Sequence, residues 1–179
     1  RLLVVELLAA ELGAALERRR LLERLRDLAR TDPLTGLANR RHWDERLALE
    51  LARAERYERP LCVAAIDLDR FKPYNDTYGH QAGDALLCAA TSAWSGALRG
   101  ADLLSRLGGD EFALLLRATP AQVGDRADRV VEALAQPLLV EGHELHVAGS
   151  LGVVPRSDTS SMGDLLRRAD LAMYAAKAE

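Results

Sequence analysis

The sequence predicts an α+β fold in which an antiparallel sheet is flanked by helices and preceded by a long N-terminal helix. Two short apolar runs, residues 103–107 and 112–116, are separated by Gly108 and Gly109, which is typical of a β-hairpin. A third apolar run, residues 61–66, has the length of a buried strand. Stretches with helical periodicity lie between the runs, and the strands outnumber those of a simple parallel pattern, so we expect an antiparallel sheet.

Length and composition fit one folded domain with an N-terminal extension. The chain has 179 residues, of which 49% are hydrophobic, enough to bury a substantial core. The formal net charge is only −3, which argues against nonspecific nucleic-acid binding, so we expect no nucleic-acid partner. We place the boundary between an N-terminal helical stalk, residues 1–30, and the folded domain, residues 31–179.

The sequence also favours a cytoplasmic location. No apolar run approaches the roughly 20 residues of a membrane helix and no export signal is visible, so we expect no membrane contact within this segment. Cys62 and Cys88 lie in apolar stretches without the spacing of a metal or redox site, which favours buried thiols in a reducing compartment. Because the chain begins with Arg1 instead of Met, we expect it to be a fragment, for example the cytoplasmic part of a larger sensor protein.

The stalk, residues 1–30, has the pattern of one long helix. Its apolar residues recur every three or four positions in one stripe and continue in a second stripe shifted by one position: Val5, Leu8, Leu12, Ala15 and Leu22, then Leu21, Leu25 and Leu28. The shift predicts a coiled coil with an interrupted register. Three arginines, residues 18–20, interrupt the apolar seam, so a helix that lies on its own domain is the alternative.

The segment that follows the stalk is expected to be structural. Asp32 precedes Pro33 and therefore ends the helical pattern, since the residue before a proline is pushed out of the helical region. Asn39 can cap the next helix, which we expect over residues 40–57. The polar residues before that helix would fix how the stalk enters the domain, and we assign them no catalytic role.

Acidic residues stand at the ends of the predicted strands. Asp67 and Asp69 are two positions apart and can share a face, and the Leu68 carbonyl between them is available to a cation. Such residues are also common as solvent-exposed strand caps, which is the alternative. At the hairpin, Asp110 and Glu111 are adjacent, so their side chains point to opposite faces and cannot do the same job.

The rest of the chain is expected to alternate helices and strands. We expect a helix over residues 79–98, a helix from Pro120 to about residue 136, a strand over residues 145–154 and a last helix that begins at a Ser161 capping box. Asn75 and Asp84 bracket the start of the first of these helices; taken alone, they fit a turn residue and a first-turn carboxylate. His80 is either a helix cap or a ligand contact.

Five sequence blocks together resemble one known family. Residues 108–112 spell the signature of the GGDEF family, whose members are diguanylate cyclases. The other four blocks lie where that family has them: DPLTGLANR at residues 32–40, DLDRFKPYND at 67–76, YGHQAGD at 78–84 and ADLAMYAAK at 169–177. The domain is identified as a member of this family, and the resemblance implies a palm-like, ferredoxin-like architecture.

The resemblance implies that two GTP molecules are condensed to cyclic di-GMP with release of two pyrophosphates. It implies Mg²⁺ or Mn²⁺ as the cofactor, two ions per active site, with Asp67, Asp110 and the Leu68 carbonyl as ligands. Because the product joins two nucleotides symmetrically, two domains are expected to face each other in a homodimer. The stalk would carry a signal from an upstream sensor domain of the full-length protein.

The family's motifs also imply roles for single residues. The implied catalytic residues are Asp110, Glu111 and Lys72, and the two carboxylates remain alternative bases for the attacking hydroxyl. The implied phosphate-binding groups are the backbone amides of Arg70 and Phe71 and the side chains of Lys72 and Lys177. Asn75 and Asp84 are implied to bind guanine. Further implied substrate-binding residues are His80, Gly108 and Gly109. A carboxylate and an amide together can read the donor and acceptor edge of guanine.

A second site, for inhibition by the product, is implied by Arg99 and Asp102, which match the family's R-x-x-D motif ahead of the hairpin. The two side chains would hold guanine or phosphate edges of cyclic di-GMP, with Arg106 assisting. The same spacing also occurs as an ion pair on helix surfaces.

Two rival functions remain open at this point. The domain could be a noncatalytic GGDEF module that binds GTP or cyclic di-GMP and signals through the stalk. Alternatively, a coiled-coil dimerisation segment could carry an inert domain that binds no nucleotide.

Overall fold

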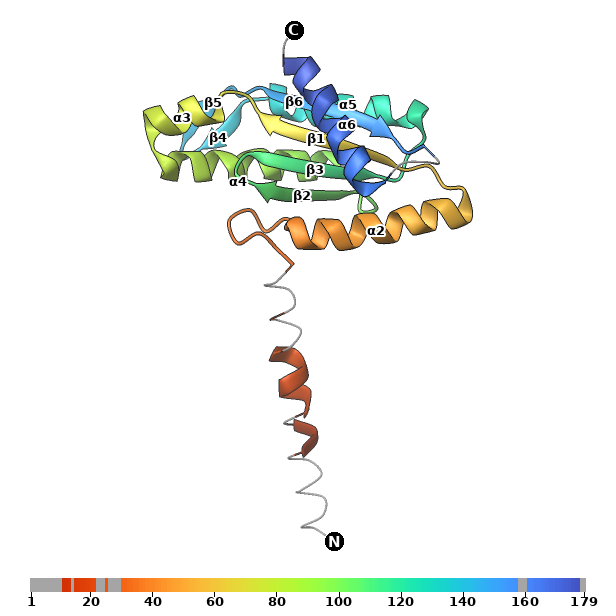
Figure 1. Ribbon diagram of the computed structural model, residues 1–179. Coiled ribbons are helices and arrows are strands. Elements are labelled where there is room, and N and C mark those ends of the chain that lie inside the picture. Colours follow the sequence, from red (N-terminus) through yellow and green to blue (C-terminus); the bar gives the residue numbers. More distant parts are fainter. Residues whose placement is uncertain (1–10, 14, 22–24, 26–29, 158–160, 178–179) are drawn as a thin grey trace.

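A four-stranded antiparallel sheet forms the centre of this computed structural model, which describes residues 11–13, 15–21, 25, 30–157 and 161–177 (Figure 1). The strands lie in the order β2-β3-β1-β6, with β1 at Cys62–Leu68, β2 at Leu103–Gly108, β3 at Glu111–Leu116 and β6 at Gly149–Pro155. The antiparallel sheet with flanking helices confirms the α+β fold that the sequence predicts.

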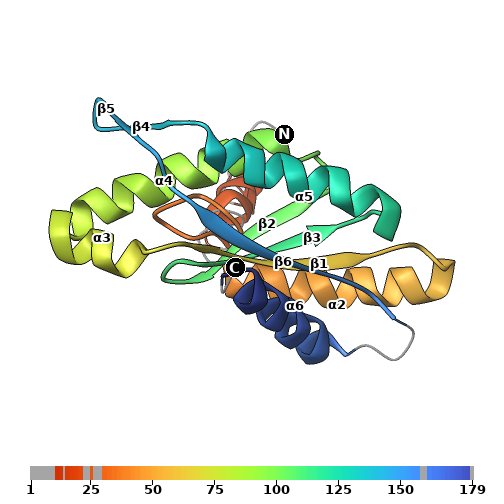
Figure 2. The same ribbon diagram turned by 90° about the horizontal axis from the view of Figure 1, so that it is seen from above.

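Helices cover both faces of the sheet (Figure 2). On one face lie α4 (His80–Ala97) and α5 (Pro120–Ala135), and on the other lie α2 (Arg40–Tyr57) and α6 (Met162–Lys177). The side chains of β1 alternate between these layers, so its sequence reads as a continuous apolar run. Cys62, Ala64, Ile66 and Leu68 pack toward α4, whereas Val63 and Ala65 pack toward α2 and α6.

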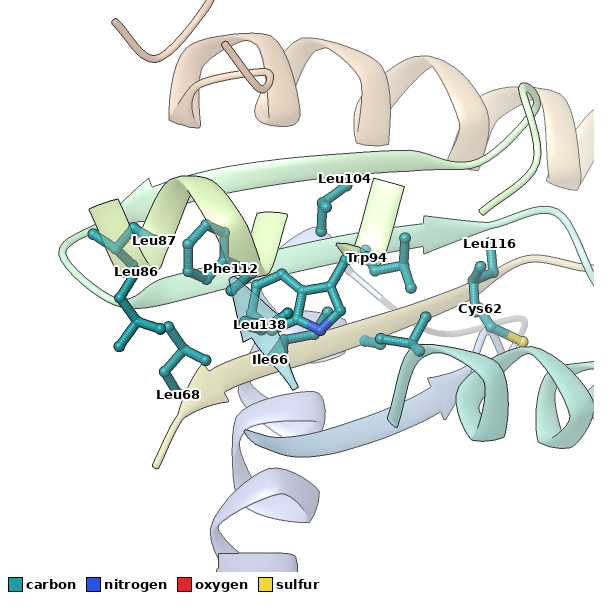
Figure 3. Close-up of a cluster of buried hydrophobic side chains, with 14 of the residues drawn as sticks. Cys62, Ile66, Leu68, Leu86, Leu87, Trp94, Leu104, Phe112, Leu116 and Leu138 are labelled. Atoms are coloured by element: carbon teal, nitrogen blue, oxygen red, sulfur yellow. The ribbon is translucent and has the colours of Figure 1, made fainter. Parts of the chain in front are cut away.

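The core on the α4 face holds the predicted hairpin in place. Phe112, which follows the turn residues, is fully buried, and its ring lies edge-on to Trp94 of α4 with 5.0 Å between the ring centroids (Figure 3). Removing a buried aromatic side chain of this kind costs about 3–5 kcal/mol, so the contact fixes where the turn can lie.

The hairpin itself has the predicted position. Leu103 pairs with Leu115, and the register shifts between Arg106 and Gly108, as in a β-bulge. Gly109 has φ +51, a left-handed value that glycine adopts without steric cost. The sequence prediction of two strands joined by a Gly-Gly turn is confirmed.

The predicted helix over residues 79–98 is confirmed as α4, and a further helix that was not predicted precedes it. Helix α3, at Phe71–Tyr78, precedes α4, and the chain turns between them at Gly79, whose φ of +86 is not helical. The prediction missed α3 because it contains Pro73. A proline is tolerated in the first turn of a helix, where the missing N–H has no partner anyway.

The predicted strand over residues 145–154 also needs correction. Strand β6 begins only at Gly149, and the preceding residues form a separate two-stranded sheet of β4 (Leu138–Val140) and β5 (His143–Leu145). The turn between β4 and β5 contains Gly142 with φ +84, a turn signal that the sequence analysis did not use.

Helix boundaries were predicted better than strand boundaries. Helix α2 spans the predicted residues, and the Asn39 side chain caps it by accepting a hydrogen bond from the His42 backbone N–H at 3.1 Å. Before α6, the Asp164 backbone N–H donates to the Ser161 hydroxyl at 3.1 Å, as predicted. Caps act over three residues of chain and are therefore readable from sequence.

The described part of the stalk is helical at residues 11–13, 15–21 and 25. Its leucines are between 51% and 63% exposed, so this part does not lie on its own domain (Figure 1). Val5, Leu8, Leu22 and Leu28 of the predicted stripes lie outside the described residues. Among the helices that the structure describes, none has the length and apolar character needed to cross a bilayer.

Candidate active site

The acidic residues predicted to hold metal lie at the end of β1 and the start of β3. Because the two strands pair antiparallel, Asp67 stands directly opposite Glu111, and Asp110 precedes it in the turn. By alternation, Asp67 lies on the same face of β1 as Ala65, toward α6. Like charges opposite each other on neighbouring strands repel, so this edge of the sheet attracts a cation.

Lys177, at the end of α6, supplies positive charge there. Its Nζ lies 2.6 Å from Asp67 Oδ1 and 3.8 Å from Asp69 Oδ1. The Asp67 and Lys177 side chains are 17% and 28% exposed, so the pair is partly shielded from water. The sequence analysis noted that Asp67 and Asp69 can share a face, and in the structure the Lys177 ammonium lies near both carboxylates.

The pKa of Asp67 is raised above its ordinary value. Burial is the largest cause, and the negative charges of Asp110 and Asp69 add to it, while the hydrogen bond and charge of Lys177 act in the opposite direction. A carboxyl group that remains difficult to ionise despite a lysine at hydrogen-bond distance lies in a field that a further cation would relieve. The electrostatics therefore favour cation binding beside Asp67.

The oxygen donors at this edge of the sheet fit a small divalent ion that also binds substrate phosphates and water. The described residues contain no group of three or more His, Cys, Asp or Glu side chains gathered as a complete metal site. Mg²⁺ is usually held by one or two carboxylates together with substrate phosphates and water, and Asp67, Asp110 and the Leu68 carbonyl are donors of the types that it takes. The Lys177 ammonium shows that a cation is accommodated at this place.

A cleft of about 760 Å³ lies next to this acidic edge, and it brings together four of the predicted residues, Leu68, Arg70, Phe71 and Lys177. Helix α3 begins here, and in the part of the chain that the structure describes no side chain caps its N-terminus. Uncapped N–H groups at a helix start bind anions such as phosphates. Arg70 has φ +58, a left-handed conformation that costs a non-glycine residue about 1–3 kcal/mol and is concentrated at functional sites.

The predicted guanine-binding residues lie on the helix pair beyond the cleft. Asn75 is in the last part of α3, and Asp84 is exposed in the first part of α4. The Asn75 Oδ1 is buried and has no hydrogen-bond partner among the described residues, which costs about 1–3 kcal/mol. Lys72 and His80 are exposed.

Arg106 lies between the hairpin turn and the segment that follows the stalk. Its Nε donates to the Gly109 carbonyl at 2.9 Å, and its Nη1 lies 3.1 Å from Asp32 Oδ1. The Thr35 backbone N–H and hydroxyl donate to the same Asp32 oxygen. The polar segment therefore has the structural role that the sequence analysis gave it, and Arg106 is placed against the turn.

The partner of Asp102 is a residue that the sequence analysis missed. Arg126 of α5 lies with Nη1 2.8 Å from Asp102 Oδ1, and the Asp102 side chain is only 1% exposed. The Arg99 backbone N–H donates to the other Asp102 oxygen at 3.2 Å. The alternative of an ion pair within the R-x-x-D motif is wrong, because the described ion pair of Asp102 reaches to α5. No local pattern marks Arg126, because the contact joins two separate elements.

Comparison with known proteins places this arrangement in a family. The model of the family "Diguanylate cyclase, GGDEF domain" matches residues 29–179. Probable diguanylate cyclase DgcC of Escherichia coli K12 is 39% identical over 156 residues, which cover 86% of this chain and 42% of that protein. Diguanylate cyclase DgcP of Pseudomonas aeruginosa is 40% identical over 158 residues, covering 87% of this chain and 24% of that protein. This chain thus spans less than half of either relative.

Solved structures agree with these relatives. The coiled coil and GGDEF domain of DgcB from Caulobacter crescentus, in complex with c-di-GMP, has a TM-score of 0.87 at 33% identity and covers 97% of this chain and 94% of that one. Diguanylate cyclase SiaD of Pseudomonas aeruginosa, in complex with its activator SiaC, has a TM-score of 0.81 at 34% identity and covers 95% of this chain and 67% of that one. The family match over the whole folded domain, the relatives and the shared fold show that this chain belongs to the diguanylate cyclase GGDEF domain family.

Proposed function

We propose that this chain is a diguanylate cyclase that condenses two GTP molecules into cyclic di-GMP, with release of two pyrophosphates, in the presence of Mg²⁺ or Mn²⁺. One observation carries the proposal: Lys177 contacts Asp67, which lies within the electrostatic reach of Asp110, and also lines a cleft that contains the uncapped start of α3. Opposite charges beside free backbone amides suit a triphosphate with its counter-cations.

The residues around the cleft bind and orient the triphosphate. Backbone N–H groups of Arg70 and Phe71 and the ammonium groups of Lys72 and Lys177 hold its negative oxygens. Lys177 then moves from the carboxylates to the phosphates, because Asp67 and Asp110 face the cation that accompanies the nucleotide. When bound, divalent ions, two per site in this proposal, neutralise developing negative charge on the phosphates and the leaving pyrophosphate.

The attacking 3′-hydroxyl has to lose a proton as it bonds to the α-phosphorus of the other nucleotide. Two carboxylates can accept this proton, Asp110 in the turn and Glu111 at the start of β3. Glu111 is exposed and stands opposite Asp67, so it can meet a second nucleotide that approaches from outside. Glu111→Gln tests the assignment, because Glu111 is not assigned to the metal: a changed pH dependence of kcat in this variant identifies Glu111 as the base, and an unchanged one leaves Asp110.

The reaction requires two copies of the domain. One site orients one nucleotide, and the product contains two that are related by a twofold axis, so two domains face each other as a homodimer. The exposed leucines of the stalk provide an apolar stripe for pairing the two chains. In the full-length protein, an upstream sensor domain would act through this stalk.

Incubation with GTP and Mg²⁺, followed by chromatography of the products, tests the activity. We expect cyclic di-GMP from the wild-type chain and none from Asp110→Ala, whereas Asp125→Ala, an exposed carboxylate on α5, leaves the product unchanged. Binding of GTP without turnover at every protein concentration would instead identify a noncatalytic module. Absence of both binding and turnover would leave only an inert domain on a dimerising stalk.

We further propose that cyclic di-GMP inhibits the enzyme at Arg99, Asp102 and Arg126. Asp102 orients Arg126 by a buried ion pair and leaves the exposed Arg99 side chain free to meet the ligand. In this proposal Arg106 supports the neighbouring turn rather than the ligand.

Titration with added cyclic di-GMP tests this second site. We expect Arg99→Ala and Arg126→Ala to raise the inhibitory concentration about tenfold or more, because each removes a charge-assisted hydrogen bond. Arg168→Ala, an exposed arginine on α6, is the matched control. Equal inhibition of all four proteins would remove the regulatory proposal and leave the catalytic one intact.

A further inference from the structure

The side chain of Asn75 lies against a residue that has no side chain, Gly83. The chain reverses at Gly79, whose φ of +86 and ψ of 163 are accessible to glycine. Two backbone hydrogen bonds follow the reversal: the Gly79 N–H donates to the Asn75 carbonyl at 2.8 Å, and the Gly83 N–H donates to the Gly79 carbonyl at 3.2 Å. The last turn of α3 is thereby folded against the first turn of α4.

The Asn75 amide occupies the space in which any other residue at position 83 would place its Cβ. A Cβ added to Gly83 would overlap Asn75 Oδ1, come within 2.8 Å of Cγ and lie 3.3 Å from Nδ2. These contacts include all three outer atoms of the amide group, so the conflict remains if the oxygen and nitrogen are exchanged. Gly83 is itself buried.

Packing, and not hydrogen bonding, holds this amide. The Asn75 Oδ1 is buried without a hydrogen-bond partner among the described side chains and backbone groups. Contact with the backbone of Gly83 therefore limits the positions that the Asn75 amide can adopt.

We propose that Gly83 is a positioning residue for guanine recognition, an inference that rests on the proposed function. Asp84, the second residue assigned to guanine, is next to Gly83 in the chain, so the contact between Asn75 and Gly83 also sets the spacing between the two groups that read the base. Any side chain at position 83 displaces the amide and separates it from Asp84.

The surroundings of Gly83 indicate that a side chain at this position would impair nucleotide binding and not folding. The three atoms nearest to a Cβ added at Gly83 all belong to the Asn75 side chain, which can rotate outward. Elsewhere in α4, a Cβ added to Gly96 would have no described atom beyond the local helix backbone within 4 Å, so an alanine fits there freely. Gly96 therefore provides a control in the same helix.

The test compares Gly83→Ala with Gly96→Ala, using initial rates with GTP and with ITP, which lacks the 2-amino group of guanine. For Gly83→Ala we expect KM for GTP to rise about tenfold, with a smaller change in kcat, because a contact to the base and not to the reacting phosphate is lost. The preference for GTP over ITP should fall with it. Gly96→Ala should keep both KM values, and both variants should unfold at or above the wild-type Tm, since alanine favours the helix.

A double-mutant cycle separates positioning of Asn75 from any other effect of the alanine. Asn75→Ala removes the amide, so adding Gly83→Ala to it should change KM for GTP no further. The proposal is overturned if Gly83→Ala retains wild-type KM and GTP preference, or if it causes the same loss with and without Asn75.

Nucleotide binding without turnover keeps the two proposals distinguishable. Displacement of a fluorescent GTP analogue by GTP and by ITP gives the base preference of each variant directly. A wild-type chain that binds GTP but makes no cyclic di-GMP contradicts the proposed function, while the variants still decide the role of Gly83. A wild-type chain that binds GTP and ITP equally contradicts the positioning role even if it makes product.

Discussion

At the scale of single residues, Lys177 is the group on which the charge balance of the candidate site depends. It is the one described partner that lowers the pKa of Asp67 against burial and two neighbouring carboxylates. The chain contains only two lysines among its 24 basic residues, Lys72 and Lys177, and both are assigned to phosphates. A compact ammonium can move between a carboxylate and a phosphate, whereas a planar guanidinium is bound by its geometry to one partner.

We therefore expect Lys177→Met to lower the rate of product formation about tenfold or more, through loss of a charge-assisted contact to the phosphates. Lys177→Arg should recover less than half of the rate that Lys177→Met loses. Arg167→Met, an exposed position of the same helix, serves as the control. Wild-type kinetics in Lys177→Met would exclude this residue from phosphate binding.

Asp32 gives a pH-dependent prediction. Burial alone would raise its pKa, but hydrogen bonds from Thr35 and the charge of Arg106 outweigh burial, so the pKa is lowered. A lowered pKa in the folded state contributes stability above the unfolded pKa of about 3.9, and this stability is lost as the pH falls through the folded pKa. The contribution is thus present at pH 7.

Asp32→Asn should lower the free energy of unfolding at pH 7 by about 1–2 kcal/mol, because it weakens hydrogen bonds to a charged group. Urea unfolding at several pH values should show the difference from wild type narrowing below about pH 4. Asp128→Asn, exposed on α5, should have no such effect. A difference that stays constant down to about pH 2.5 would mean that the charge of Asp32 is not responsible.

At the scale of elements, the position of α6 against the sheet decides where Lys177 lies. A Cβ on Gly152 of β6 would collide with the Ala169 carbonyl oxygen and the Met173 backbone nitrogen, and would lie 2.8 Å from Met173 Cα. These are backbone atoms of α6, so they cannot move aside separately. The glycine thus allows the helix to approach the strand closely and to place its last turn beside Asp67.

Gly152→Ala should therefore destabilise the domain by about 1–3 kcal/mol, the usual cost of overpacking, and should also lower activity by displacing Lys177. Thermal unfolding and initial rates measure the two effects. Gly163→Ala, on α6, should instead be neutral or stabilising, since no described atom beyond the local helix backbone lies within 4 Å of the added Cβ. Unchanged thermal stability of Gly152→Ala would show that α6 can move away from β6 without a loss of folding free energy.

At the scale of the whole molecule, activity is expected to depend on the pairing of two chains. The cleft beside the acidic edge is proposed to orient one nucleotide, and the described stalk residues expose apolar side chains to solvent. Leu12 and Leu16 are four positions apart and lie on one side of the helix. This stripe is the proposed contact between two chains.

Introducing charge into the apolar stripe tests whether the stripe pairs the two chains. Leu12→Lys with Leu16→Lys should weaken the dimer in sedimentation equilibrium and lower the specific activity at low protein concentration, while the catalytic domain unfolds as before. Glu17→Lys adds a lysine beside the stripe and should preserve the dimer. Specific activity that is independent of protein concentration, in both variants and wild type, would contradict activity as a homodimer.

Local patterns in the sequence were sufficient for the hairpin, for α2 with its Asn39 cap and for the buried strand β1, because turn conformation, capping and alternation act over a few residues. They were insufficient for α3, where a first-turn proline obscured the helix, and for β5, which has only three residues. The residues predicted to bind phosphate at Arg70 and Phe71 do lie on the cleft with Lys177.

The sequence by itself determined the family, the antiparallel class of the sheet and the chemical types of the groups at the proposed site, since each of these depends on short motifs and on their order along the chain. Only the tertiary structure decided which groups meet: Lys177 with Asp67, 110 residues away, Arg126 with Asp102, and the Asn75 amide with Gly83. Each of these contacts depends on how one element packs against another, and packing depends on the volume and burial of many residues together.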